Sequence, residues 1–142
     1  MSDNKNGFTL MELLIAIAVM GVLAAIGMST YASSQKLARD ARRKSDLKQY
    51  QTSLENYANK SGSLYPVATT ITNIQSYCAT LGISGTCPTD PTSGQYSYIT
   101  DSGGTVYVLW GYLEKSTNYW ILCSDGRSGT SAAAPTSYSC PI

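Results

Sequence analysis

The chain has 142 residues, with ten lysines and arginines against nine acidic residues, so its net charge is only +1. This balance excludes a general attraction to nucleic acid, and the lack of histidine removes the commonest general base of enzymes. Acids are few, and the sequence has neither a phosphate-binding loop nor a G-x-S-x-G motif. We therefore expect a protein that is not an enzyme and has no cofactor. Its length allows one long helix and one small domain.

An apolar run from Phe8 to Met28 dominates the N-terminal part, and Glu12 is its only charged residue. At about 1.5 Å per residue, a helix of this length spans roughly 30 Å, the thickness of a membrane's hydrocarbon core. A secretory signal peptide and a plain membrane anchor are alternatives, but neither explains an acid, which costs about 2.5–3.5 kcal/mol in a membrane. We therefore expect a membrane-spanning helix in which Glu12 has a partner.

The residues around this glutamate carry a family resemblance. Gly7, followed by FTLME at residues 8–12 and an apolar helix, resembles the processing site of type IV pilins and type II secretion pseudopilins. The resemblance implies that residues 1–7 are a leader, that a prepilin peptidase cuts between Gly7 and Phe8, and that Phe8 becomes N-methylated. It also implies that Glu12 meets the terminal amine of a neighbouring subunit during assembly. A buried carboxylate beside an ammonium removes two isolated charges at once, which is physically consistent.

The helix is expected to leave the membrane near residue 31 and to continue as an amphipathic segment over residues 32–61. Neither glycine nor proline interrupts the chain between Met28 and Ser61. The proline that many pilins carry late in this helix is also missing, so the sequence predicts one unbroken helix of about 50 residues. A stripe at intervals of three and four residues predicts the face that packs on the following domain: Leu37, Ala41, Lys44, Leu47, Tyr50, Leu54 and Tyr57.

A basic cluster lies in the same segment, because residues 36–48 hold six basic residues against two acidic ones. We interpret these basic residues as lying mostly off the stripe, on a solvated face. Anionic lipid head groups and acidic patches on neighbouring subunits are the alternative contacts. The cluster would favour a cytoplasmic location by the positive-inside rule, whereas the cysteines described below favour the opposite side of the membrane.

Residues 62–142 are expected to form a globular head. Gly62 ends the helix, and the Gly-Ser-Leu-Tyr-Pro sequence at 62–66 resembles the connection that follows the long helix of many pseudopilins. Apolar spacing then predicts a short helix over residues 70–82, with Ile71, Ile74, Cys78 and Leu81 on one face. Three strands rich in β-branched and aromatic residues follow at 96–100, 105–113 and 119–123. Their short connections predict a three-stranded antiparallel sheet that covers the helical stripe.

The four cysteines, Cys78, Cys87, Cys123 and Cys140, all follow the apolar run. An even number on one side of a membrane anchor indicates two disulfides in an oxidising compartment. The sequence allows three pairings, of which we favour the two bonds between neighbours, Cys78–Cys87 and Cys123–Cys140. A metal site is disfavoured because the chain has no CxxC spacing and no histidine.

Residues 124–141 show no periodicity and predict a surface loop closed by the last cysteine. The Ser-Asp-Gly stretch at 124–126 loosely resembles a motif of the major pseudopilins, in which the aspartate helps to bind calcium. Residues 127–131 supply no second acid here, so we interpret Asp125 as part of a turn in preference to a calcium ligand.

Together these features predict an α+β fold, in which a long N-terminal helix packs on a small antiparallel sheet with a disulfide-closed C-terminal loop. The resemblance implies a structural subunit of a type IV pilus or related filament, with copies of itself, prepilin peptidase, the membrane assembly machinery and lipid as partners. It places the protein in the bacterial inner membrane before assembly and in an extracellular or periplasmic filament afterwards. A pseudopilin of a secretion or competence system is one alternative. A membrane-tethered adhesion module, whose tyrosines and basic segment contact a surface ligand or DNA, is another.

Overall fold

The computed structural model describes residues 7–142, so residues 1–6 of the expected leader lie outside the described part. Its elements are the helix α1 (Leu10–Lys60), the strands β1 (Thr72–Asn73), β2 (Ser97–Thr100), β3 (Tyr107–Leu113), β4 (Asn118–Cys123) and β5 (Ser128–Ser131), and a single-turn 3₁₀ helix (Ile74–Tyr77). The predicted unbroken helix is confirmed by α1, which has 51 residues. Contacts within the chain define two compact units, one up to Gln35 and one from Lys36 to Ile142.

The first unit is the apolar part of α1. Its most apolar stretch of 18 residues has a mean hydropathy of 2.4, and none of that stretch is buried. By length and composition, α1 is the one helix among residues 7–142 that is able to cross a membrane, a property that N-terminal signal sequences share. Hydroxyl groups near the end of the run bond back to the helix, with Thr30 donating to the Ile26 carbonyl at 2.9 Å and Ser34 to the Thr30 carbonyl at 3.0 Å. These hydroxyls therefore bring no unpaired donor into an apolar helix.

The second unit contains an antiparallel sheet in the order β1-β2-β3-β4-β5. The three predicted strands correspond to β2, β3 and β4, with ends that differ by up to two residues. The expectation of a loop throughout residues 124–141 was wrong, because β5 pairs with β4 from Ser128 opposite Leu122 to Ser131 opposite Tyr119. The sequence Ser-Gly-Thr-Ser of β5 has no apolar alternation, so the usual strand signal is missing there.

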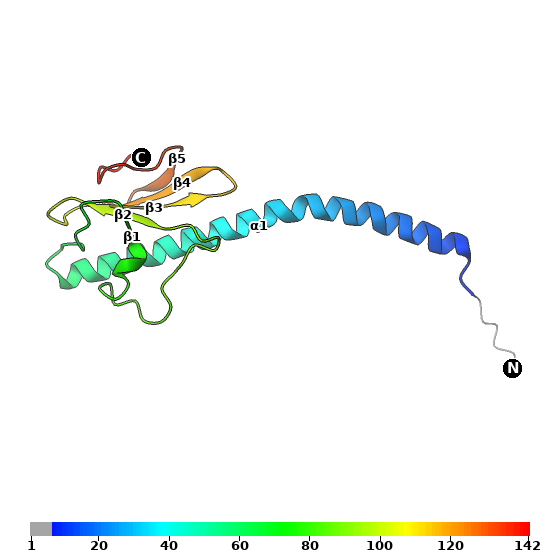
Figure 1. The fold of residues 1–142 in the computed structure, drawn as a ribbon, viewed down its shortest axis with the longest axis horizontal. Coiled ribbons are helices and arrows are strands. Elements are labelled where there is room, and N and C mark those ends of the chain that lie inside the picture. Colours follow the sequence, from blue (N-terminus) through cyan, green and yellow to red (C-terminus); the bar gives the residue numbers. More distant parts are fainter. Residues whose placement is uncertain (1–6) are drawn as a thin grey trace. The chain divides into compact units, whose positions relative to one another are not determined.

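The two faces of this sheet pack against different partners. Tyr98, Leu109 and Leu122 point toward α1 and form one core with Leu47, Tyr50 and Leu54 of the helix. Alternate residues of the same strands point to the other face, where Val108, Trp110 and Ile121 pack with Cys140 and Ile142. Figure 1 shows β2, β3 and β4 beside the C-terminal half of α1 and the C-terminal segment on the far side of the sheet.

The helical stripe was predicted correctly only in its C-terminal part. Leu47, Tyr50 and Leu54 are fully buried, whereas Leu37, Ala41 and Lys44 are exposed. Toward the N-terminal end the buried positions are instead Asp40 and Arg43. Lys44 lies beside the sheet, with its ammonium 4.5 Å from the centre of the Trp120 ring. The buried stripe therefore changes from apolar to ionic along the helix, which apolar spacing alone did not indicate.

The predicted helix over residues 70–82 was mostly wrong. Thr72 and Asn73 pair with Tyr98 and Ser97 as β1, and only one 3₁₀ turn follows. The side chain of Asn73 accepts a hydrogen bond from the Gln75 amide at 3.1 Å and begins this turn. Ile74, Cys78 and Leu81 are nevertheless buried, as their spacing predicted, while Ile71 is exposed.

Candidate functional site

The start of α1 is held by a reciprocal pair of polar side chains. The Thr9 amide donates to the Glu12 carboxylate at 3.0 Å, the Thr9 hydroxyl donates to the same oxygen at 2.9 Å, and the Glu12 amide donates to the Thr9 hydroxyl at 3.2 Å. This arrangement is a capping box, in which two amides that a helix leaves unpaired at its start are satisfied by side chains. Glu12 therefore has a partner within its own chain.

This intramolecular role of Glu12 was missed from the sequence, although the signal was present. A threonine followed three residues later by glutamate, just before an apolar run, is the pattern of a capping box. The side chains of Phe8, Leu10 and Met11 around it are largely exposed. Thr9 and Glu12 thus form a polar start to an otherwise apolar helix.

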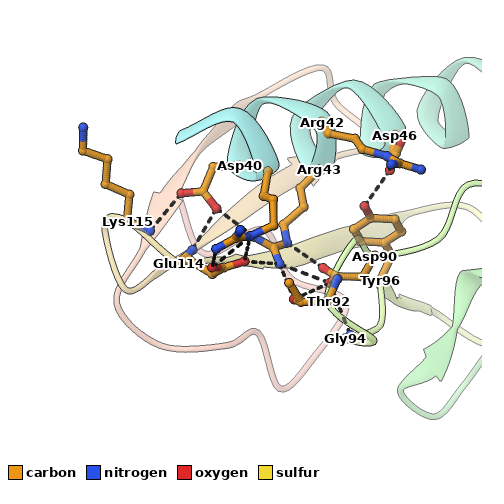
Figure 2. A network of polar contacts seen from close by, with 11 residues as sticks. Asp40, Arg42, Arg43, Asp46, Asp90, Thr92, Gly94, Tyr96, Glu114 and Lys115 are labelled. Carbon is orange, nitrogen blue, oxygen red and sulfur yellow. Dashed lines mark hydrogen bonds and ion pairs between the residues drawn. The ribbon is translucent and has the colours of Figure 1, made fainter. Parts of the chain in front are cut away.

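The second unit contains a buried ionic network centred on Arg43, whose side chain is only 2% exposed (Figure 2). Its guanidinium donates to both oxygens of Asp90, from Nε at 2.6 Å and from Nη2 at 3.1 Å. It also donates from Nη1 to Asp40 at 2.9 Å and from Nη2 to the Thr92 hydroxyl at 2.6 Å. Glu114 completes the set, at 2.6 Å from Nη2. One side chain of α1 thus contacts two distant segments of the head.

The carboxylates of the network also hold the backbone of these segments. Asp40 accepts the amides of Glu114 at 2.8 Å and of Lys115 at 2.9 Å, where β3 ends. Asp90 accepts the amides of Thr92 at 2.8 Å and Gly94 at 3.2 Å, which closes the turn of its loop. The connection between β3 and β4 and the loop at residues 90–94 are therefore both attached to α1.

The pKa values in this network follow from its charges. Burial raises the pKa of the Asp90 carboxyl, but hydrogen bonds from Arg43 and Thr92 outweigh burial and hold that pKa well below its usual range. Hydrogen bonds from Arg39 and then Arg43 lower the pKa of Glu114 to about 2. The pKa of Arg43 is raised, mainly by its hydrogen bond to Asp90. All these groups are therefore charged at neutral pH.

The interpretation of the basic cluster as a solvated face was wrong for two of its residues. Arg43 is buried, and Arg39 forms a two-pronged contact with Glu114, with Nη2 and Oε2 2.5 Å apart. Arg43 pairs with Asp40 three residues away, but the other acidic partners, Asp90 and Glu114, lie 47 to 75 residues away in the sequence, so local patterning gave no sign of them. Lys36, Arg42, Lys44 and Lys48 remain exposed.

Two disulfides join Cys78 to Cys87 and Cys123 to Cys140, the same neighbours that the sequence favoured. The first closes a loop that lies just before Asp90, and the second ties the C-terminal segment to the end of β4. Both bonds therefore hold segments that the strands leave unpaired.

Asp125 lies close to the sulfurs of Cys123 and Cys140, within 4.8 Å. Both sulfurs are already bonded to each other, so they offer no thiolate to a metal. The Asp125 carboxylate accepts from the Arg127 guanidinium at 2.7 Å and from the Arg127 amide at 3.0 Å. Arg127 also donates to the carbonyl of Ile142. The position next to this aspartate is thus occupied by an arginine, which agrees with the turn interpretation.

Comparison with known proteins places the chain by its N-terminal region. The family model of the prokaryotic N-terminal methylation motif matches residues 2–28. The pilin-like protein PilA3 of Thermus thermophilus is 44% identical over 43 residues, which are 30% of this chain and 18% of the relative's length. The match therefore spans less than a fifth of that relative. No solved structure matches the chain.

The fold and these matches agree with one another. A family model covers the apolar start of the chain, and the described chain has the long helix, antiparallel sheet and C-terminal disulfide expected of a pilin-like head. The chain therefore carries the prokaryotic N-terminal methylation motif and is similar, in its N-terminal region, to a type IV pilin-like protein.

Proposed function

We propose that this protein is a structural subunit of a type IV pilus or pilus-like filament. A prepilin peptidase removes residues 1–7 by cutting between Gly7 and Phe8, and Phe8 is then N-methylated. The subunit is anchored in the membrane before assembly, and the apolar part of α1 then packs in the filament. The methylation-motif match at residues 2–28 supports this processing.

The observation that carries the proposal is the exposure of apolar side chains on all sides of the first part of α1. Leu10, Leu14, Val19 and Ile26 are each more than half exposed, and they lie on different sides of the helix. Such a surface is not stable in water, because about 25 cal/mol is lost for each Å² of apolar area left there. Lipid before assembly and neighbouring copies of the same helix afterwards both cover it. Contacts that repeat head to tail do not close, so a filament is the expected product.

Glu12 is proposed to guide this assembly. Cleavage after Gly7 creates an ammonium group on Phe8, and the Glu12 carboxylate of a neighbouring subunit neutralises it. The capping box supports this role, because it holds the carboxylate at the start of the helix, close to the new N-terminus. The interaction between subunits then replaces the one with Thr9.

Variants of Glu12 test the charge separately from the cap. Glutamine is also a capping-box residue, so Glu12→Gln keeps the cap and loses the charge, whereas Glu12→Ala loses both. We expect both variants to be cleaved and to remain in the membrane, and the yield of sheared filaments to fall at least about tenfold in each, since an unpaired charge costs several kcal/mol. Thr9→Ala is the matched control, because it weakens the cap by about 1 kcal/mol and leaves the charge in place. Normal filament yield from Glu12→Gln would show that the charge has no role.

The head is proposed to lie on the outer side of the membrane. Two disulfides within residues 78–140 require an oxidising compartment to form and persist. Trapping of free thiols in intact cells tests this placement, since both pairs should be oxidised and unreactive. Electron microscopy of the same cells distinguishes a pilus that extends from the cell from a short pseudopilus.

A further inference from the structure

The outer face of the sheet, which points away from α1, is only partly covered. Cys140 and Ile142 pack on the residues at one end of this face, around Val108 and Ile121. Next to them a groove of about 410 Å³ remains open, bounded by residues 134–136 of the C-terminal segment. The groove belongs entirely to the second unit, so it exists in the subunit whether or not a filament forms.

Aromatic side chains line this groove. Trp110 is 4% exposed and lies in its wall, while Tyr112 is 44% exposed and Tyr119 is half-buried. Tyr112 and Tyr119 are directly opposite each other on β3 and β4, and their ring centres are 5.5 Å apart at an angle of 64°. The two rings form an edge-to-face pair within the lining of the groove.

Tyr112 differs from most tyrosines of this protein. Tyr50, Tyr96, Tyr98 and Tyr107 are buried in the core beside α1, so the eleven tyrosines do not form a general adhesive surface. The exposed tyrosines among residues 7–142 are Tyr31, Tyr112 and Tyr138. Of these three, only Tyr112 lies in the groove.

The polar groups in the lining of the groove are neutral. Gln95, Ser97 and Thr136 lie in its lining beside the tyrosine pair. Within residues 7–142, the hydroxyl groups of Tyr112 and Tyr119 and the side-chain amide of Gln95 form no hydrogen bond with the protein. No charged side chain among the described residues lines the groove.

These features select one class of ligand. A nucleic acid needs cations to neutralise its phosphates, and the lining offers none. A purely apolar partner would leave the hydroxyl and amide groups without hydrogen bonds, at a cost for each. A sugar has apolar C–H faces that stack on aromatic rings and hydroxyl groups that bond to neutral donors and acceptors. We propose that the groove binds a neutral carbohydrate, with a sugar ring on Tyr112 and Tyr119 and its hydroxyl groups bonded to Gln95 and Ser97.

Tryptophan fluorescence measures such binding directly, because Trp110 lies in the groove. The other tryptophan, Trp120, points toward α1 and contacts Lys44, so Trp120→Phe leaves Trp110 as the sole reporter. The full chain in detergent is titrated with neutral hexasaccharides of glucose, mannose, galactose and N-acetylglucosamine, and with polygalacturonate as a charged comparison. We expect at least one neutral hexasaccharide to shift the fluorescence saturably, and polygalacturonate to have no effect.

Variants then locate the site. Tyr112→Ala and Tyr119→Ala should each weaken binding about tenfold, because an aromatic contact at the centre of a site carries much of the affinity. Tyr138→Ala is the matched control, since Tyr138 is 50% exposed and lies outside the groove. Melting temperatures verify that the variants fold. The proposal is wrong if no neutral hexasaccharide binds, if polygalacturonate binds best, or if the folded variants bind like the parent. If no sugar binds and Tyr112→Ala prevents filament formation, a second copy of the chain is the occupant instead.

Discussion

Arg43 of α1 connects the helix to two loops of the head. Its guanidinium contacts the carboxylates of Asp40, Asp90 and Glu114, at distances of 2.9, 2.6 and 2.6 Å for the closest atoms. A buried ion network adds little net stability compared with apolar packing, but removing one partner leaves unpaired charges that are expensive. The network thus fixes where two loops lie on α1 and is sensitive to any single loss.

Replacement of Arg43 by alanine should destabilise the head strongly. We expect the free energy of unfolding to fall by about 3–5 kcal/mol, because three carboxylates lose their shared cation. Urea unfolding of the full chain in detergent, followed by tryptophan fluorescence, measures this change. Arg42→Ala is the control, since the Arg42 side chain is 62% exposed and 3.9 Å from Asp46. That variant should lose less than about 0.5 kcal/mol, and a similar loss in both variants would contradict the role of the network.

The network also predicts a loss of stability in acid. The pKa of Glu114 is lowered from 4.5 to about 2, and that of Asp90 is lowered as well, so the folded state binds fewer protons than the unfolded state below pH 5. Their contribution is fully present above the ordinary pKa values and is lost as the pH falls toward 2. Unfolding measured at pH 7, 5, 4 and 3 should show this decline. Glu114→Gln should be less stable at pH 7 and decline less steeply, and an unchanged slope would contradict the assignment.

At the level of residues, the sequence indicates partners that are close along the chain. Thr9 and Glu12 are three residues apart, so the sequence itself contains the capping-box pattern. Arg43 and Asp90 are 47 residues apart, and only the folded chain brings them together. The favoured disulfides were bonds between neighbouring cysteines, which is again a short-range relation.

At the level of elements, the turn between β2 and β3 depends on one glycine. Gly104 has a φ of +67°, and a Cβ atom there would lie 2.5 Å from the carbonyl oxygen of Tyr65. The Tyr65 amide also donates to the Gly104 carbonyl at 2.8 Å. The segment after α1 therefore lies directly against this turn, with no room for a side chain.

Gly104→Ala should accordingly destabilise the head by about 2–4 kcal/mol, through a left-handed backbone and a steric clash together. Gly126→Ala is the matched control, because Gly126 has a φ of +85° with no atom within 4 Å of an added Cβ. That variant should lose only the cost of placing alanine in a left-handed backbone conformation, about 1–2 kcal/mol. Thermal unfolding of both variants separates the cost of the left-handed backbone from the cost of the steric clash. Equal losses would mean that the contact with Tyr65 does not restrict the turn.

Elements with a regular apolar or β-branched pattern were predictable from the sequence. Elements that form only by pairing with a neighbouring strand were not. α1 and the strands β2 to β4 combine length with apolar or β-branched content, and their existence followed from the sequence. β5 and β1 are short and polar, and they are strands only because β4 and β2 offer free edges. The apolar residues of segment 70–82 are spaced as in a helix, but Thr72 and Asn73 pair with the edge of β2 and form a strand instead.

At the level of the whole molecule, the two units differ in the surroundings that they need. The unit up to Gln35 exposes an apolar helix, which requires lipid or other helices around it. The unit from Lys36 onward has its own core, ionic network and disulfides, and these suit water and oxidising conditions. The proposed function requires these two environments, since the subunit would leave the membrane for a filament.

The first residue of the mature protein tests this function most directly. Filaments are sheared from cells that produce the chain, and the subunit is analysed by N-terminal sequencing and mass spectrometry. We predict a chain that begins at N-methylated Phe8, so that Glu12 is the fifth residue of the mature chain. A protein that keeps residues 1–7, or one cut near Ala32 and secreted without its apolar helix, would contradict the proposed function.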